Sequence, residues 1–148
     1  MKKTAIIILF ALAVCLLFGA CTGNVEISDG TYRAEYDSYD QHGYKDFVEI
    51  TFVDGAVTEI TADAVSEADG SLKSTSEEYR KDMESLENGT YPEKYYKDLI
   101  NQYIANPSAD AVDVVAGATT SSKSFKALAA ALEHAVRSGN TDTVIVKR

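Results

Sequence analysis

The sequence has few of the residues that bind metals or crosslink small exported domains. It contains two Cys, two His and no Trp in 148 residues. Two Cys cannot supply the ligand set of a zinc finger. Lys and Arg total 14 against 23 Asp and Glu, a net charge of -9. This acidic balance excludes the nucleic-acid binders, which need a basic face. The hydrophobic content of 45% and charged content of 25% are those of one globular domain.

The N-terminus has the pattern of an export signal. A basic start, Met-Lys-Lys, precedes an apolar run over residues 4–18 that is shorter than the roughly 20 residues of a membrane-spanning helix. Gly and Ala then lead into Cys21, which resembles a bacterial lipobox. We expect residues 1–20 to be a lipoprotein signal peptide, residues 21–28 a tether and residues 29–148 the domain. Lipidated Cys21 would anchor the domain to the extracytoplasmic side of the cell membrane. An ordinary signal peptide with an incidental Cys and an uncleaved anchor remain alternatives.

The first half of the domain has strand patterns. A turn at residues 29–32 precedes a strand to about residue 36, and residues 37–44 form a loop. Residues 46–53 alternate in hydropathy, Asp54-Gly55 is a tight-turn sequence, and residues 56–62 return as a second strand. Residues 63–73 are expected to form a loop.

The second half is mainly helical. Ser74 and Glu77 form a capping-box pattern for a helix over about 75–86, ended by Asn88-Gly89. A second helix begins near Pro92, with an apolar stripe at helical spacing, and Pro107 ends it. We further expect a short strand at 112–116, a helix at 122–138 and an edge strand at 143–146. The fold class is α+β: a small antiparallel sheet carrying three or so helices on one side.

Small and hydroxylic residues connect the predicted strand at 112–116 to the last helix. Gly117 permits close approach of a ligand, Ala118 adds little bulk, and Thr119 presents a hydroxyl. Thr120, Ser121 and Ser122 follow at the helix start, where free N–H groups and a partial positive charge favour a phosphate. These residues predict a phosphate site, although Ser and Thr at this position also fit a simple helix cap.

The segment Asp113 to Thr119, D-V-V-A-G-A-T, resembles the flavinylation motif D-x-x-[S/T/A]-G-A-T of the FMN-binding domain family. Ala116 departs from the commoner Ser or Thr. The resemblance extends to D-G-T-Y at residues 29–32, H-G-Y at residues 42–44 and K-S-x-x-x-x-Y at residues 73–79. It covers about residues 29–136. The family includes flavin-carrying subunits of Rnf and sodium-translocating NADH:quinone reductase complexes, as well as small bacterial lipoproteins.

The resemblance implies a covalent flavin. FMN would be attached to Thr119 by a phosphoester bond, installed outside the membrane by a flavin transferase that uses FAD and a divalent metal. Asp113 would orient the loop or be read by the transferase. The chain would then be a lipid-anchored electron carrier that meets redox partner proteins, and a transferase substrate rather than an enzyme. Nothing in the sequence demands more than a monomer. The alternatives are noncovalent FMN, or another phosphate ligand, at the same helix terminus and a surface binding or scaffolding lipoprotein without flavin.

Other polar and aromatic residues are weaker candidates. His42 is expected to be a loop histidine, and Asp37 and Asp40 a solvated acidic loop, because EF-hand spacing is absent. Ser121 and Ser122 lack the nucleophile elbow of a hydrolase. A flavin ring would need flat neighbours. By residue type these are Tyr44, Tyr79, Tyr91, Tyr95, Tyr96 and Tyr103.

Overall fold

The computed structural model describes residues 27–86 and 89–148. The predicted signal peptide, Cys21 and the predicted helix stop at Asn88 lie outside the described residues. Over the part that is described, no helix has both the length and the apolar character needed to cross a bilayer.

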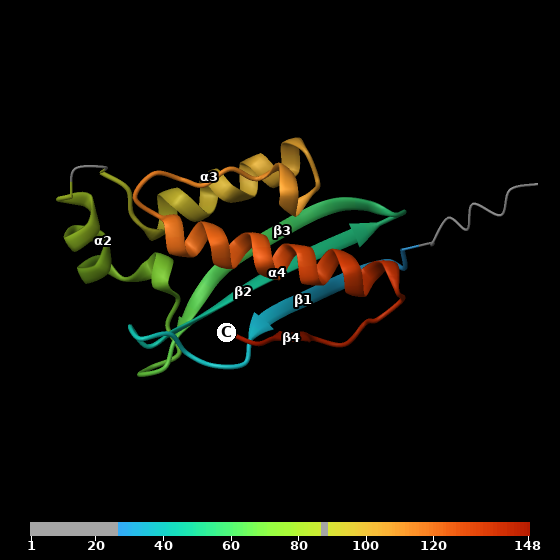
Figure 1. Cartoon of the computed structure of the whole chain (residues 1–148), viewed down its shortest axis with the longest axis horizontal. Helices are drawn as coiled ribbons and strands as arrows, with labels where there is room; N and C mark the ends of the chain where they lie inside the picture. The colour runs from blue at the N-terminus through green and yellow to red at the C-terminus, as the bar shows by residue number, and fades with distance from the viewer. Residues whose placement is uncertain (1–26, 87–88) are drawn as a thin grey trace, which may run out of the picture.

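One four-stranded sheet forms the base of the domain (Figure 1). Its strands are β1 (Gly30–Tyr36), β2 (Tyr44–Val53), β3 (Ala56–Ser66) and β4 (Val144–Val146), in the order β3-β2-β1-β4. The α+β class is confirmed, but the sheet is mixed, because β4 pairs parallel to β1 while the other pairs are antiparallel. A helix runs back along the sheet before β4, and this return makes the last strand parallel.

The hairpin of β2 and β3 follows the predicted alternation. Asp54 and Gly55 both have positive φ, 52° and 73°, as tight hairpin turns require. Val48, Ile50 and Phe52 are buried on the core face of β2. The predicted end of β3 at residue 62 is wrong, since the strand continues to Ser66. Asp63 is tolerated in it because its carboxylate accepts hydrogen bonds from the backbone N–H and the hydroxyl of Ser74.

That contact also corrects the predicted capping box. Lys73–Thr75 form a short 3-10 turn, η1, and the helix α2 (Glu77–Glu84) begins only after Ser76. The Ser76 hydroxyl accepts the Tyr79 N–H at 3.2 Å, which is the cap that was predicted for Ser74. Ser74 is unavailable because Asp63 holds it.

Two long helices, α3 (Pro92–Ala105) and α4 (Thr119–Arg137), cover one face of the sheet (Figure 1). The apolar stripe predicted for the helix after Pro92 is buried in α3, and Pro92 stands in the first turn of that helix. The helix α4 starts at Thr119, three residues before the prediction. The buried positions are Tyr95, Tyr96, Leu99 and Tyr103 on α3, and Phe125, Leu128, Leu132 and Val136 on α4.

The predicted strand at 112–116 is wrong. This segment follows a 3-10 turn, η2 (Ala109–Ala111), and lies outside the sheet. Side chains take the place of a strand partner. Gln102 accepts the Asp113 N–H at 2.7 Å, and the Lys126 ammonium donates to the Val112 carbonyl at 2.6 Å. The segment is therefore held against α3 and α4, and it leads into the first residue of α4.

Candidate functional site

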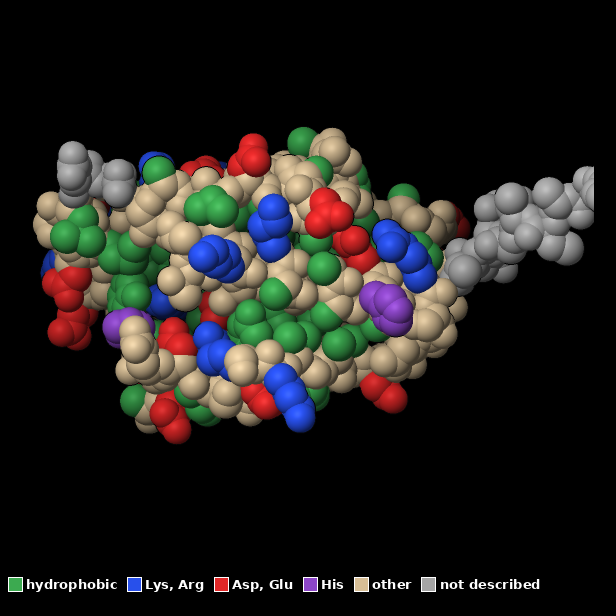
Figure 2. Space-filling model, viewed as in Figure 1, with side chains coloured by type: hydrophobic (Ala, Val, Ile, Leu, Met, Phe, Trp, Pro, Cys, Tyr) green, Lys and Arg blue, Asp and Glu red, His purple; other side chains and the backbone are tan. Residues whose placement is uncertain are grey.

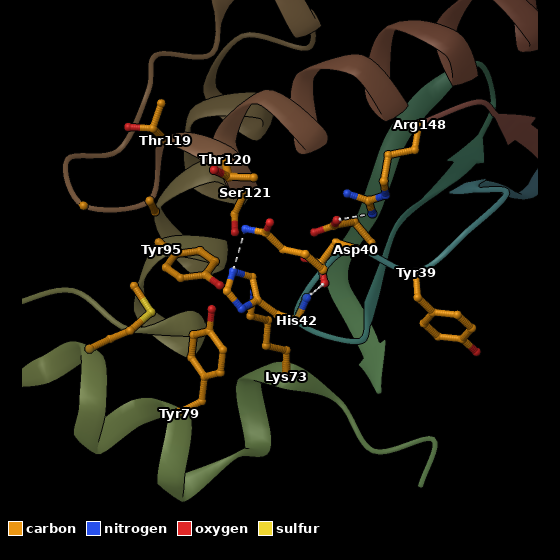
Figure 3. Close-up of a pocket in the computed structure, with 15 residues that line it drawn as sticks. Tyr39, Asp40, His42, Lys73, Tyr79, Tyr95, Thr119, Thr120, Ser121 and Arg148 are labelled. Atoms are coloured by element: carbon orange, nitrogen blue, oxygen red, sulfur yellow. Dashed lines mark hydrogen bonds and ion pairs between the residues drawn. The ribbon is translucent and has the colours of Figure 1, made fainter. Parts of the chain in front are cut away.

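A cavity of about 660 Å³ opens at the end of the domain where α4 begins. Figure 2 shows this end of the molecule hollowed beside α2, with hydrophobic side chains on its wall. Its lining comes from the turn at 117–121, the loop at 39–42, Asp46 of β2, η1, α2, α3 and Arg148 (Figure 3). Residues far apart in the sequence therefore meet around one opening.

The turn before α4 leaves the helix N-terminus open. Gly117 has φ +80°, a conformation that other residues avoid, and Ala118 is the N-cap. Ala118 has no side-chain cap, and no other side chain of the described residues accepts a hydrogen bond from the first N–H groups of α4. The hydroxyl of Ser122 instead accepts the Val115 N–H at 3.0 Å and donates to the Ala118 carbonyl at 2.8 Å. The simple-cap interpretation of the Ser/Thr cluster is thus wrong. The residues that carry the first N–H groups of α4, Thr119 to Ser121, line the cavity.

The predicted site residues separate into two groups. Gly117, Ala118, Thr119, Thr120 and Ser121 line the cavity. Thr119 and Thr120 are exposed, and Figure 3 shows Thr119 at the outer edge of the cavity.

The second group lies outside the cavity lining. Ser122 is fully buried, and its hydroxyl is used inside the turn. Asp113 is exposed, and its backbone N–H and carbonyl are held by Gln102. The structure therefore gives Ser122 a role in holding the turn and places Asp113 away from the cavity.

Lys73 is buried in the wall opposite the turn. Its side chain lies among aromatic rings: Nζ is 4.5 Å from the ring centroid of Tyr79 and 4.9 Å from that of Tyr44. These two rings pack edge to face, 5.7 Å apart. Burial alone lowers the pKa of the Lys73 ammonium, but the oxygens of Tyr95, Tyr79 and Asp46 outweigh burial and raise the pKa. Lys73 therefore carries a positive charge at neutral pH.

Of the Tyr candidates on α3 and at its start, Tyr95 is the one that lines the cavity. Its Oη is buried and has no hydrogen-bond partner in the described structure. Burial raises the pKa of this phenol, partly opposed by Lys73 and by the nearby Ser121 hydroxyl, so it keeps its proton at neutral pH. Among the other candidates, Tyr79 also lines the cavity, and Tyr44 packs behind it against Lys73.

The remaining charges at the cavity are paired. Asp46 is buried and accepts hydrogen bonds from Arg148 at 3.0 Å and from the Tyr96 hydroxyl at 3.2 Å. Asp40 accepts the N–H groups of His42 and Tyr44 and so shapes its own loop. These contacts leave the ammonium of Lys73 as the cation without an ion pair among the described lining residues.

His42 lines the cavity from the exposed loop, where Gln41 lies 3.2 Å from its Nε2. Within residues 27–86 and 89–148, no group of three His, Cys, Asp or Glu side chains is arranged to hold a metal ion. The lining instead offers hydroxyls, open N–H groups, aromatic rings and a buried cation, which suits a flat ligand that also carries an anionic group.

Sequence reasoning missed the charged lining residues Lys73, Asp46 and Arg148. Only Lys73 had a signal, because it opens the K-S-x-x-x-x-Y pattern at residues 73–79. Asp46 and Arg148 are 102 positions apart, and only folding brings them together.

Known proteins resemble the chain over most of its length. A 15 kDa lipoprotein of Treponema pallidum (strain Nichols) is 38% identical over 136 residues, which are 92% of this chain and 94% of that protein. The crystal structure of a Clostridium perfringens protein matches with a TM-score of 0.76 and 31% identity, over 82% of this chain and 98% of that one. Residues 43–133 match the FMN-binding domain, and this match includes Lys73, Tyr95 and the whole turn from Asp113 to Ser122. The chain therefore belongs to the FMN-binding domain family.

Proposed function

We propose that this protein is a lipid-anchored, extracytoplasmic electron carrier with FMN attached to Thr119 by a phosphoester bond. The observation that carries the proposal is the position of Thr119. It is an exposed hydroxyl residue, the first of α4, at the edge of the cavity and beside an uncapped helix N-terminus. A phosphate joined to its Oγ1 would lie next to unpaired N–H groups and the positive end of the helix dipole.

The cavity fits the rest of the cofactor. Its volume of about 660 Å³ falls within the range of about 300–1,000 Å³ for small-molecule pockets. Tyr79 supplies an aromatic surface, while Lys73 and Tyr95 supply donors for the polar edge of a flavin ring. Bound flavin supplies reversible electron transfer, and the protein supplies position and electrostatics.

The attachment step uses FAD as co-reactant and a separate flavin transferase with a divalent metal. The Thr119 oxygen attacks the phosphorus of the FMN half of FAD. A Thr–O–P bond forms, the phosphoanhydride bond breaks, AMP leaves, and the hydroxyl proton is released. Gly117 and Ala118 add little bulk beside the hydroxyl, which keeps it accessible to an enzyme. In this proposal the chain is the substrate of the transferase and a redox carrier.

In this proposal the lipid anchor and the flavin belong to opposite ends of α4. Ile27 lies beside Val136 and Arg137 at the C-terminal end of α4, whereas Thr119 opens its N-terminal end. A 19-residue helix is about 28 Å long. Lipid on Cys21, the lipobox cysteine, would therefore hold the domain at the membrane with the flavin directed toward partner proteins. The name of the Treponema pallidum relative supports a lipoprotein. In this proposal the chain is a monomer that exchanges electrons with redox partner proteins.

Intact mass spectrometry of protein co-expressed with a flavin transferase tests the proposal. The expected result is a mass increase of FMN less water, with yellow colour that stays with the chain after denaturation. Thr119→Ala should abolish both, and the exposed neighbour variant Thr120→Ala should keep both. Flavin lost on denaturation would indicate noncovalent FMN. A colourless, unmodified protein would leave the scaffolding lipoprotein as the better account.

A further inference from the structure

One buried polar atom in the cavity wall lacks a hydrogen-bond partner, and a mostly buried cation in the same wall lacks an ion pair among the described residues. Lys73 is 5% exposed, and its ammonium makes no ion pair with any described carboxylate. Tyr95 is 1% exposed, and its hydroxyl has no hydrogen-bond partner in the described structure. A buried polar group without a partner costs about 1–3 kcal/mol, so native structures rarely keep one without a use.

The surroundings of Lys73 hold the charge without neutralising it. The rings of Tyr44 and Tyr79 lie within 5 Å of Nζ and stabilise the cation by their π faces. The nearby carboxylate of Asp46 is already paired with Arg148. The ammonium therefore remains available to a ligand that is negatively charged or rich in acceptor atoms.

Tyr95 adds a neutral donor at the same wall. It comes from α3, whereas Lys73 comes from η1, and both elements bring their side chains to one side of the cavity (Figure 3). The turn that carries Thr119 also lines the cavity, and its Ser121 lies beside Tyr95. A ligand tethered at Thr119 would meet the open N–H groups of α4 first and the Lys73–Tyr95 pair inside the cavity.

We propose that Lys73 and Tyr95 form the subsite for the carbonyl-rich pyrimidine edge of the flavin ring, and that the Lys73 charge favours the reduced flavin. This inference rests on the proposed function. Two electrons and one proton convert the oxidised ring to a reduced form with one negative charge at this edge. A cation there stabilises the reduced ring more than the neutral oxidised one, because the attraction between opposite charges is strong at a desolvated site. Lys73 thus raises the midpoint potential.

The potential of the loaded protein tests the electrostatic part. Reductive titration with dithionite is carried out on wild type, Lys73→Met and Tyr95→Phe, each loaded by the transferase. Lys73→Met should reduce the stabilisation of the reduced flavin relative to the oxidised flavin at least about tenfold. This change lowers the midpoint potential by about 30 mV for two electrons. Tyr95→Phe should shift the potential in the same direction by a smaller amount. Lys94→Met, next to Tyr95 but exposed, is the matched control and should leave it unchanged.

A second experiment needs no covalent attachment. Lumiflavin, which has the ring but no phosphate, is titrated against unmodified chain by fluorescence. It should bind wild type and Lys94→Met equally, and Lys73→Met and Tyr95→Phe several-fold more weakly. Thermal unfolding checks that the variants are folded, since Met keeps the length of the Lys stem and Phe removes only one oxygen.

The outcomes separate the two proposals. An adduct on Thr119 together with a Lys73→Met potential equal to that of Lys94→Met overturns the subsite and leaves the attachment intact. If wild type carries no adduct on Thr119 but lumiflavin binding still depends on Lys73 and Tyr95, the attachment is overturned and the subsite stands. Inorganic phosphate that displaces lumiflavin from wild type but not from Lys73→Met would assign Lys73 to the phosphate instead. Absence of lumiflavin binding to wild type would also contradict the subsite.

Discussion

The Ser122 hydroxyl lies 3.0 Å from the Val115 nitrogen and accepts its N–H. This bond crosses the turn that carries Thr119 and ties it to the first turn of α4, where Ser122 also donates to the Ala118 carbonyl. Ser122 is fully buried, so no water replaces it. The position of the candidate acceptor is therefore set by a side chain that lies outside the cavity.

Ser122→Ala should destabilise the domain, because the Val115 N–H loses its acceptor. The expected cost is about 1–2 kcal/mol, or a fall of about 4 °C in Tm for each kcal/mol. Differential scanning calorimetry measures the fall in Tm. Thr120→Ala, at an exposed position, is the control and should keep the wild-type Tm. Equal Tm values for the two variants would show that the Ser122 bridge contributes nothing.

Gly117→Ala should impair both stability and flavin attachment. A Cβ at φ +80° costs about 1 kcal/mol and distorts the turn beside Thr119. Gly55→Ala is a matched control, since Gly55 has φ +73° in the β2–β3 hairpin with open space around it. Both variants should lose similar stability in urea unfolding, but only Gly117→Ala should lower the yield of the flavin adduct. Similar adduct yields would contradict a requirement for this turn geometry.

Three buried phenols of α3 should make the fold sensitive to alkali. Burial raises the pKa of Tyr95, Tyr96 and Tyr103, with further increases from Asp46 at Tyr96 and Glu133 at Tyr103. Their folded pKa values exceed the unfolded value of 10.0, so this stability is complete below pH 10 and is lost as pH rises further. Phenolate absorbance should therefore show a step that coincides with unfolding by circular dichroism. Smooth ionisation of all nine Tyr with an unchanged fold would contradict it.

Local sequence patterns predicted the elements whose structure is determined by residues close together in the sequence. The β2–β3 hairpin follows from alternation and the Asp54-Gly55 turn, and α3 and α4 follow from their apolar spacing. The G-A-T segment likewise indicated a loop before a helix. In each case the side chains that pack and the backbone that positions them lie within one short stretch of sequence.

Long-range partners explain the errors. Residues 112–116 have a strand-like composition, but Gln102, Lys126 and Ser122 satisfy their backbone, and no local pattern reveals those partners. Asp63 accepts a hydrogen bond from the Ser74 hydroxyl, so Ser76 caps α2 in place of Ser74. Lys73 joins the cavity because β3 and η1 fold back beside α3. Its role needed the tertiary structure, although its sequence pattern was visible.

The most direct measurement is fragmentation mass spectrometry of the peptide that contains Thr119, from protein co-expressed with the transferase. The account predicts an FMN phosphoester localised to Thr119, with neighbouring Thr120 unmodified. An adduct on another residue, or an unmodified Thr119 peptide from protein exposed to an active transferase, would contradict it.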